Sequence, residues 1–169
     1  MHLSIVTAVW NRADTVADAV QGLRTQDWTD WEQVVQDGGS PDGTLQVLDG
    51  LLGHRAYLES GVDAGLYDAV NRGPARTTCE VVGLLHSDDL YAAPDILSSV
   101  AAVLKNPGID AVYGDLLYVA RTDTLRVART LRSQPFSPAL LRRGWMPPTC
   151  LRQTAEVGDI RPRCPDANA

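Results

Sequence analysis

The sequence predicts an α/β fold with a mainly parallel sheet and helices on both of its faces. Strand-like and helix-like segments alternate along most of the chain, which is the pattern of α/β proteins. Two of the strand-like segments, residues 3–9 and 81–85, are apolar nearly throughout, as strands covered on both faces are. At 169 residues, the chain has the length of one domain with a core of its own.

The first half of the chain contains the clearest alternation. Residues 3–9 predict the first strand, and the helix expected after them opens with a capping-box pattern at residues 15–18. Residues 32–37 predict the second strand, which ends in a glycine-rich turn. We expect the next helix to begin near Ser40-Pro41, because proline suits the first helical turn.

The second half is less regular. Residues 63–73 are too polar for a core helix and too patterned for an irregular loop, so we expect this segment to lie over a ligand. The other expected elements are strands at 56–60, 81–85 and 111–115, a helix at 94–105, and a hairpin of 116–121 and 125–130.

Charge and composition exclude several classes of protein. A net charge of -6 and a pI near 4.9 argue against a nucleic-acid partner. The cysteines Cys79, Cys150 and Cys164 lack C-x-x-C spacing, and His2 and His54 do not complete a cluster with them, so we expect neither disulfides nor a zinc site. No apolar run approaches the roughly 20 residues of a membrane span. We expect a cytoplasmic protein, with peripheral attachment to the inner face of the membrane as the alternative.

The strongest chemical signal is the acidic pair Asp88-Asp89, directly after the apolar residues 81–85. Open α/β sheets bind ligands at the carboxyl ends of their strands, where this pair would lie. Carboxylate oxygens suit Mg²⁺ or Mn²⁺, and such an ion can bridge to a diphosphate. For an isolated acidic pair, the alternative is a turn cap before Pro94.

Other polar residues follow the other expected strands. Asp37 has the same topological position as the acidic pair and could accept from a nucleobase NH, although an ordinary turn is the alternative. Thr7 and Asn11, near the exit of the first strand, could contact a ribose or a base. Arg72 could offer its guanidinium to a phosphate, or could be a solvated surface arginine.

Four segments taken together resemble the family-2 glycosyltransferases of the GT-A fold. Their order and spacing both match, over roughly the first 120 residues. One of them, Tyr67-Asp68-Ala69-x-Asn71-Arg72-Gly73, is typical of bacterial polysaccharide and glycolipid enzymes. The segments are residues 4–11 (SIVTAVWN), 37–44 (DGGSPDGT), 63–73 (DAGLYDAVNRG) and 87–89 (SDD).

The resemblance implies a donor site for a nucleotide-diphosphate sugar of the UDP or GDP type. In that site Asp37 meets the base, Asp88 the ribose, and Asp89 the Mg²⁺ or Mn²⁺ on the diphosphate. The donor-binding set is Thr7, Asn11, Asp37, Asp68, Arg72 and Asp88. The implied reaction inverts the sugar as it passes to a hydroxyl of a saccharide or lipid-linked acceptor, in cell-surface polysaccharide or glycolipid synthesis.

The resemblance also divides the chain into a donor-binding core, residues 1–121, and an incomplete acceptor-side region, residues 122–169. After about residue 148 the sequence departs from the family, because the histidine-proline step and the later acidic pair are missing. The family takes its catalytic base from that region, and the nearest substitutes here are Asp115 and Asp159. We therefore expect a truncated or altered acceptor region, or else a short natural variant with a disordered tail.

Two other functions stay open on the sequence. The chain could be a catalytically incompetent fragment that binds a nucleotide sugar but does not transfer it. A sugar-phosphate nucleotidyltransferase shares the α/β frame, but it should carry a basic, glycine-rich loop where Trp10-Asn11-Arg12 stands.

Overall fold

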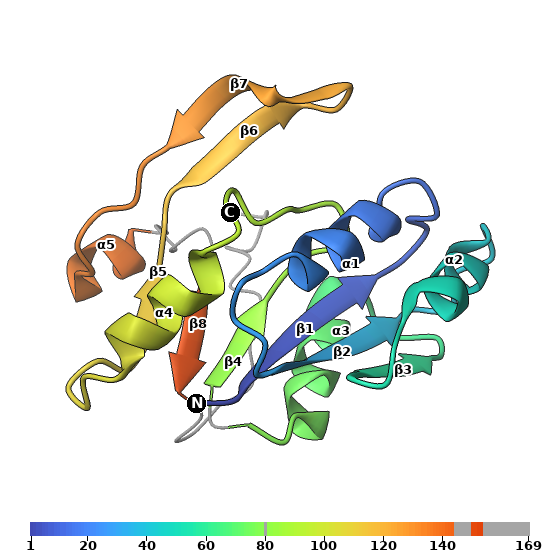
Figure 1. The fold of residues 1–169 in the computed structure, drawn as a ribbon, viewed down its shortest axis with the longest axis horizontal. Coiled ribbons are helices and arrows are strands. Elements are labelled where there is room, and N and C mark those ends of the chain that lie inside the picture. The colour runs from blue at the N-terminus through green and yellow to red at the C-terminus, as the bar shows by residue number, and fades with distance from the viewer. Residues whose placement is uncertain (80, 144–149, 154–169) are drawn as a thin grey trace, which may run out of the picture.

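The computed structural model describes residues 1–79, 81–143 and 150–153, and it has the predicted α/β architecture (Figure 1). The main sheet has the strand order β3-β2-β1-β4-β8-β5. The first four of these strands pair in parallel, whereas β8 is antiparallel to both of its neighbours. The strands are β1 (Leu3–Val9), β2 (Trp31–Asp37), β3 (Ala56–Ser60), β4 (Val81–Leu84), β5 (Ala111–Tyr113) and β8 (Cys150–Gln153).

Helices cover both faces of this sheet. On one face, α1 (Val16–Arg24), α2 (Thr44–Leu51) and α4 (Ile96–Leu104) contribute to the buried clusters, and on the other face lies α3 (Leu66–Arg72). A short 3-10 helix, η1 (Pro74–Arg76), follows α3. The hairpin of β6 (Leu116–Ala120) and β7 (Asp123–Leu131) forms a separate two-stranded sheet, and α5 (Pro138–Arg142) follows it. No helix in the described ranges is both long enough and apolar enough to span a membrane.

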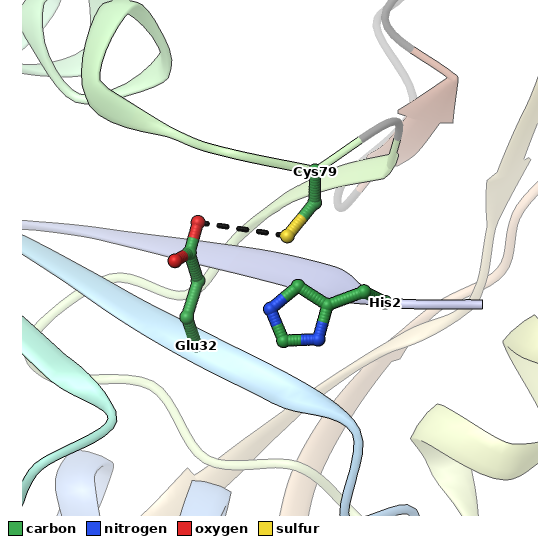
Figure 2. A group of neighbouring side chains, drawn as sticks. All are labelled: His2, Glu32 and Cys79. Carbon is green, nitrogen blue, oxygen red and sulfur yellow. Dashed lines mark hydrogen bonds between the residues drawn. The ribbon is translucent and has the colours of Figure 1, made fainter.

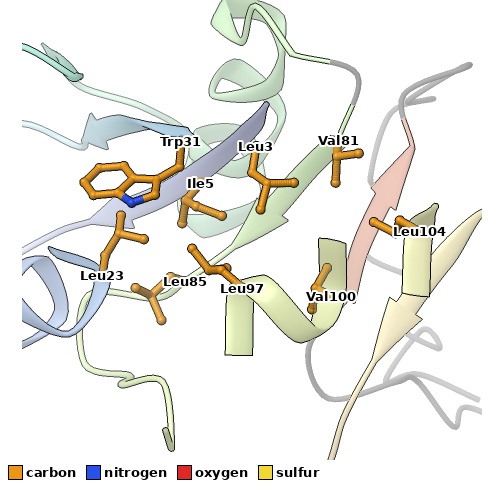
Figure 3. Close-up of a cluster of buried hydrophobic side chains, with 9 residues drawn as sticks. All are labelled: Leu3, Ile5, Leu23, Trp31, Val81, Leu85, Leu97, Val100 and Leu104. Atoms are coloured by element: carbon orange, nitrogen blue, oxygen red, sulfur yellow. The ribbon is translucent and has the colours of Figure 1, made fainter. Parts of the chain in front are cut away.

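The larger core lies between the sheet and the helices α1 and α4 (Figure 3). Leu3 and Ile5 of β1, Leu23 of α1, and Leu97 of α4 have no exposed surface. Burying one such side chain contributes roughly 1.5–3 kcal/mol, so this layer fixes β1 at the centre of the sheet.

The opposite face is packed with smaller side chains. Ala69 and Val70 of α3 contact Ala8 of β1, and Val6 lies in a neighbouring buried cluster. Gly73 follows α3 so close to the sheet that a Cβ atom there would stand 2.3 Å from Val6 Cγ1. Small residues therefore allow α3 to lie close against β1.

Three local expectations are corrected by the structure. Helix α2 begins at Thr44 and not at Ser40-Pro41, because Gly43 takes a positive φ of 98° and Asp42 accepts from the Thr44 amide. The capping box at the start of α1 does not form, since Thr15 makes no side-chain cap. Residues 66–72 of the polar segment are helical, with only Ala69 and Val70 buried.

The two regions expected from the sequence share one sheet. Strand β8 comes from the region of residues 122–169, and it pairs with β4 and β5 of the region of residues 1–121. Because β8 is antiparallel to both neighbours, β5 runs in the same direction as β4. The carboxyl ends of β1, β2, β4 and β5 therefore meet at one edge of the sheet.

Candidate functional site

The carboxyl edge of the sheet gathers the predicted acidic residues. Asp37 ends β2 opposite Val9 of β1, and Leu84 of β4 lies opposite Val6 on the other side of β1. Asp88 and Asp89 follow β4 in the next loop, so one strand separates them from Asp37. Two strand spacings amount to about 10 Å, which is a distance that one nucleotide can span.

The loop after β1 joins the two neighbouring loops. The Asn11 amide donates to Ser40 Oγ at 2.8 Å, and the Arg12 amide donates to Thr44 Oγ1 at 2.9 Å. On the other side, Arg12 Nε lies 3.6 Å from Asp88 Oδ2. The loop after β1 is thus hydrogen-bonded to the segment after β2, and it forms an ion pair with the acidic loop after β4.

Asp37 is fully buried, and its carboxylate holds the glycine-rich turn. Oδ2 accepts from the amides of Gly39 and Ser40 and from Ser60 Oγ, while Oδ1 accepts from Ser40 Oγ. Two of these donors are fixed backbone amides, and two are hydroxyls that can rotate to other partners. A ligand NH that bonds to Asp37 would compete with these serine hydroxyls, which can turn to other partners.

The acidic pair after β4 consists of one exposed and one partly buried carboxylate. Burial raises the pKa of Asp89, and the charge of Asp88 raises it further against an opposing effect of His86. Both causes disfavour a second negative charge at this position, and a cation beside the pair would offset them. In the described ranges, this edge contains no group of three side chains with mutually close ligand atoms. A metal here would complete its coordination shell with oxygens of water or of its substrate.

Asn11 has an unusual backbone and an unsatisfied side chain. Its φ of 53° makes it the only non-glycine residue in the described part of the chain with a positive φ. Its Oδ1 is buried and has no hydrogen-bond partner among the described residues. Strained backbone and unpaired polar atoms concentrate where proteins bind ligands.

Asp68 and Arg72 of α3 pair with each other. Arg72 Nη2 lies 2.7 Å from Asp68 Oδ2, Arg72 Nε donates to Asp68 Oδ1 at 3.2 Å, and Arg72 Nη1 donates to the Val62 carbonyl. The amide of Ala64 and this guanidinium both lower the pKa of Asp68. Because a guanidinium has five N–H donors, a phosphate could bind the N–H groups of Arg72 that Asp68 does not use.

Thr7 does not belong to the edge. Its side chain has no exposed surface, and its hydroxyl accepts from Gln33 Nε2 at 3.2 Å inside the sheet. Thr7 shares a face of β1 with Leu3 and Ile5, which point into the core beneath the helices. The Thr7 side chain therefore faces the core and not the surface beside Asp37 and Asp88.

Asp115, the candidate base, follows β5 at the same edge but has partners of its own. The amide and the hydroxyl of Ser133 both donate to Asp115 Oδ1 at 2.8 Å. These bonds lower the pKa of Asp115, which makes its carboxylate a weaker proton acceptor. The other candidate, Asp159, lies outside the described residues.

Two residues at this edge were not predicted for the site. Trp10 is 62% exposed, and both Trp10 and the Asp63 carboxylate approach Gly38 so closely that a Cβ atom there would lie within 3.3 Å of each. Arg12 supplies the positive charge that forms an ion pair with Asp88. The sequence signal for both was their position directly after the first strand, next to Asn11.

Comparison with known proteins gives a consistent result. The family model described as Glycosyl transferase family 2 matches residues 4–156. A PGL/p-HBAD biosynthesis glycosyltransferase of Mycobacterium tuberculosis is 34% identical over 118 residues, which are 68% of this chain and 46% of that protein. An uncharacterized glycosyltransferase of the same organism is 33% identical over 107 residues, or 63% of this chain and 41% of that protein. The chain thus spans less than half the length of these curated relatives.

Solved structures show the same fold. The mannosyltransferase PcManGT from Pyrobaculum calidifontis, in complex with GDP-Man and Mn²⁺, superposes with a TM-score of 0.65 at 19% identity, covering 90% of this chain and 44% of that one. The TarS 1-349 structure from S. aureus, in complex with UDP-GlcNAc, gives a TM-score of 0.64 at 21% identity, covering 73% and 36%. At these identities the likeness extends to the GT-A glycosyltransferase fold alone.

Proposed function

Because this chain belongs to glycosyl transferase family 2, we propose that it transfers a sugar from a nucleotide-diphosphate sugar to a hydroxyl acceptor. The main support is the meeting of Asp37, Asp88 and Asp89 at one edge of the sheet, on either side of β1. We propose a donor of the UDP or GDP type, since similar folds have been solved with UDP-GlcNAc and with GDP-Man.

In this proposal Asp89 holds a divalent ion, Mg²⁺ or Mn²⁺. The raised pKa of Asp89 supports it, because a cation relieves the cost of two adjacent carboxylates of which one is partly buried. Magnesium sites commonly use one or two carboxylates and complete their shell with substrate phosphate oxygens, as this edge would require. The bound ion would stabilise the negative charge of the departing nucleotide diphosphate.

The remaining side chains of the edge would bind the nucleoside. Asp37 would accept from the base in place of one serine hydroxyl, and Asp88 would accept from the ribose hydroxyls. The unpaired Oδ1 of Asn11 offers a further acceptor. The exposed indole of Trp10 offers a flat face on which a base can stack.

Arg72 and Asp68 would act together on the donor. The guanidinium is held by two contacts to Asp68, which fixes its plane before any ligand arrives. We propose that a phosphate shares this guanidinium with Asp68, so that Asp68 positions Arg72 and does not touch the donor itself.

The stereochemistry, the acceptor and the cellular location complete the proposal. We propose an inverting transfer to a saccharide or lipid-linked acceptor, on the cytoplasmic side of the membrane, in cell-surface polysaccharide or glycolipid synthesis. The PGL/p-HBAD biosynthesis name of one relative supports an acceptor of this kind.

A second function is favoured by one observation, the two bonds from Ser133 to Asp115. With its pKa lowered, Asp115 is a poor base for an acceptor hydroxyl. The alternative is therefore a chain that binds the nucleotide sugar without transferring it. An assay that follows both donor hydrolysis and transfer to an added acceptor separates the two functions.

Calorimetry with UDP and with GDP tests the donor site. We expect one nucleotide to bind in the presence of Mn²⁺ and at least tenfold more weakly after chelation. Asp89→Asn should abolish this metal dependence, because a neutral amide is a weak ligand for a hard cation. Asp49→Asn, which removes an exposed carboxylate from α2, should leave binding unchanged.

Two results would contradict the site. One is binding that is equally strong with and without the metal, and the other is an Asp89→Asn variant that keeps the full metal dependence. Circular dichroism of each variant without ligand checks that the fold is intact.

A further inference from the structure

Three side chains that could bind a metal meet at the opposite edge of the sheet (Figure 2). Ligand atoms of His2, Glu32 and Cys79 all lie within 4.8 Å of one another. The Cys79 thiol donates to Glu32 Oε1 at 3.5 Å, and one nitrogen of the His2 ring points toward the same two groups. The sequence had predicted no metal cluster containing Cys79 or His2, because nothing in its spacing brings these residues together.

The sheet register explains why the sequence did not reveal this group. Leu3 of β1 lies opposite both Trp31 of β2 and Val81 of β4. His2 precedes Leu3, Glu32 follows Trp31, and Cys79 stands two residues before Val81. The three residues are far apart along the chain, and only the pairing of three parallel strands brings them together.

Other side chains already hold the cluster in place. Asp30 Oδ1 lies 2.7 Å from His2 Nδ1, which leaves the other ring nitrogen for the cluster. Glu32 accepts from Ser4 Oγ at 2.6 Å and from the amide of Thr78 at 2.8 Å. A carboxylate behind a histidine, and donors behind a ligating carboxylate, are the outer contacts that protein metal sites use.

A cavity borders the cluster on the side of His2 and Glu32. Its volume is about 340 Å³, and His2 and Glu32 line it together with residues at the starts of β2 and β3. It lies at the amino edge of the sheet, away from Asp37, Asp88 and Asp89. We expect a water molecule on this side to complete the coordination of an ion bound by the cluster.

From this geometry we propose that His2, Glu32 and Cys79 bind one Zn²⁺ ion, which clamps the amino ends of β1, β2 and β4 together. One nitrogen, one carboxylate oxygen and one sulfur form a mixed set that zinc accepts in tetrahedral sites. In such a site, neighbouring ligand atoms stand about 3.5 Å apart, so ligand atoms that now lie up to 4.8 Å apart must approach by up to about 1.3 Å. The proposal does not depend on the proposed transferase activity.

Binding of Zn²⁺ replaces the hydrogen bond between Cys79 and Glu32 with bonds from both side chains to the metal. The thiol proton that Cys79 shares with Glu32 passes to solvent, and the thiolate and the carboxylate both bind the ion. No oxidation or reduction takes place. Asp30 keeps its bond to His2 Nδ1 and so fixes the ring nitrogen that faces the metal.

The test uses the full chain without an affinity tag, after chelation and dialysis. Cobalt(II) serves as the optical probe, because a cysteine thiolate bound to it gives a near-ultraviolet charge-transfer band that oxygen ligands do not give. We expect this band at one ion per chain, and its displacement by Zn²⁺. Cys79→Ser should abolish the band, and Asp30→Asn should weaken Zn²⁺ binding by about tenfold to a hundredfold.

Matched variants show whether the band comes from this cluster. Cys164→Ser and His54→Ala remove another cysteine and another cavity histidine, and both should keep the band. Asp89→Asn should keep it too, which separates this ion from the proposed donor-site metal. A folded wild-type chain without the band, or a band that persists in Cys79→Ser, would overturn the proposal. Glu32→Gln gives a second check, because Zn²⁺ should raise the Tm of the wild type but not that of this variant.

Discussion

At the scale of single residues, Asp42 shows how one carboxylate can organise the proposed donor edge. Its Oδ1 accepts from the amide and the hydroxyl of Thr44, and its Oδ2 accepts from the amide of Ala13 in the loop after β1. The bonds from Thr44, and then the one from Ala13, hold the pKa of Asp42 below its ordinary value of 3.8. The Asp42 carboxyl therefore ionises more readily in the folded protein than in the unfolded chain.

This pKa shift predicts a pH-dependent contribution to stability. A carboxyl whose pKa falls on folding stabilises the protein above its unfolded pKa, and that contribution is lost as pH falls through the folded pKa. Asp42→Asn should therefore lower the urea midpoint at pH 7, and its difference from the wild type should narrow below about pH 4. Asp49→Asn, in the helix that follows Asp42, is the control. A difference that stays constant between pH 7 and pH 3 would show that charge is not the cause.

At the scale of elements, the contact between α3 and β1 depends on the absence of a side chain at Gly73. Gly73 has the helical angles φ -55° and ψ -58°, so alanine fits its backbone. The obstacle is Val6, which is 1% exposed, branched at Cβ, and close enough to clash with a new methyl group. The position of Asp68 and Arg72 over the sheet depends on this contact.

Gly73→Ala should therefore destabilise the protein by about 1–3 kcal/mol, the usual cost of overpacking a core. Gly50→Ala in α2 is the matched control, because a Cβ atom there meets nothing within 4 Å. That variant should stabilise the helix by roughly 0.5–1 kcal/mol. Urea denaturation of both proteins measures the difference. Equal effects of the two changes would show that Val6 has room to move.

The sequence predicted long apolar elements well and small-residue contacts poorly. Residues 3–9 formed the expected strand because a continuous apolar run suits a strand covered on both faces. That same continuity hid the orientation of Thr7, since a run without alternation does not show which face a side chain takes. Helix α3 was missed because only Ala69 and Val70 of its residues are buried, which is too little for a helical apolar stripe.

General rules of sheet topology predicted which acidic residues share this edge, but they did not predict the contacts that these residues make. Asp37, Asp88 and Asp89 could be assigned to one edge because parallel strands end together. The ion pair of Arg12 with Asp88 and the four hydrogen bonds to Asp37 depend on loop conformations, including the positive φ of Asn11. No periodicity in the sequence encodes such angles, so these contacts needed the structure.

At the scale of the whole molecule, the hairpin of β6 and β7 stands out from the main sheet (Figure 1). It carries exposed apolar side chains on both strands, among them Leu125 at 93% exposure and Tyr118 at 48%. Arg121 at its turn pairs with Asp14, and Tyr113 Oη donates to the Gln134 carbonyl after it. Apolar groups exposed together in this way favour association with a second apolar surface.

The chain should therefore self-associate through the hairpin as its concentration rises. Leu125→Lys should reduce this association, as measured by sedimentation or light scattering, because it replaces an almost fully exposed apolar side chain with a charge. Its effect on stability should stay within about 0.5 kcal/mol, as for other surface changes. Thr124→Lys adds the same charge next to it without removing apolar surface. If both variants behave alike, the charge and not the apolar surface controls association.

The position of β8 between β4 and β5 affects how the sheet can assemble while the chain is being synthesised. A ribosome releases β4 long before it reaches residues 150–153, and synthesis runs at about 5–20 residues per second. For several seconds, the nascent chain therefore presents one side of β4 with unpaired backbone groups, which other extended chains can bind. Until β8 emerges, the incomplete sheet depends on chaperones or on fast pairing of its first four strands to avoid aggregation.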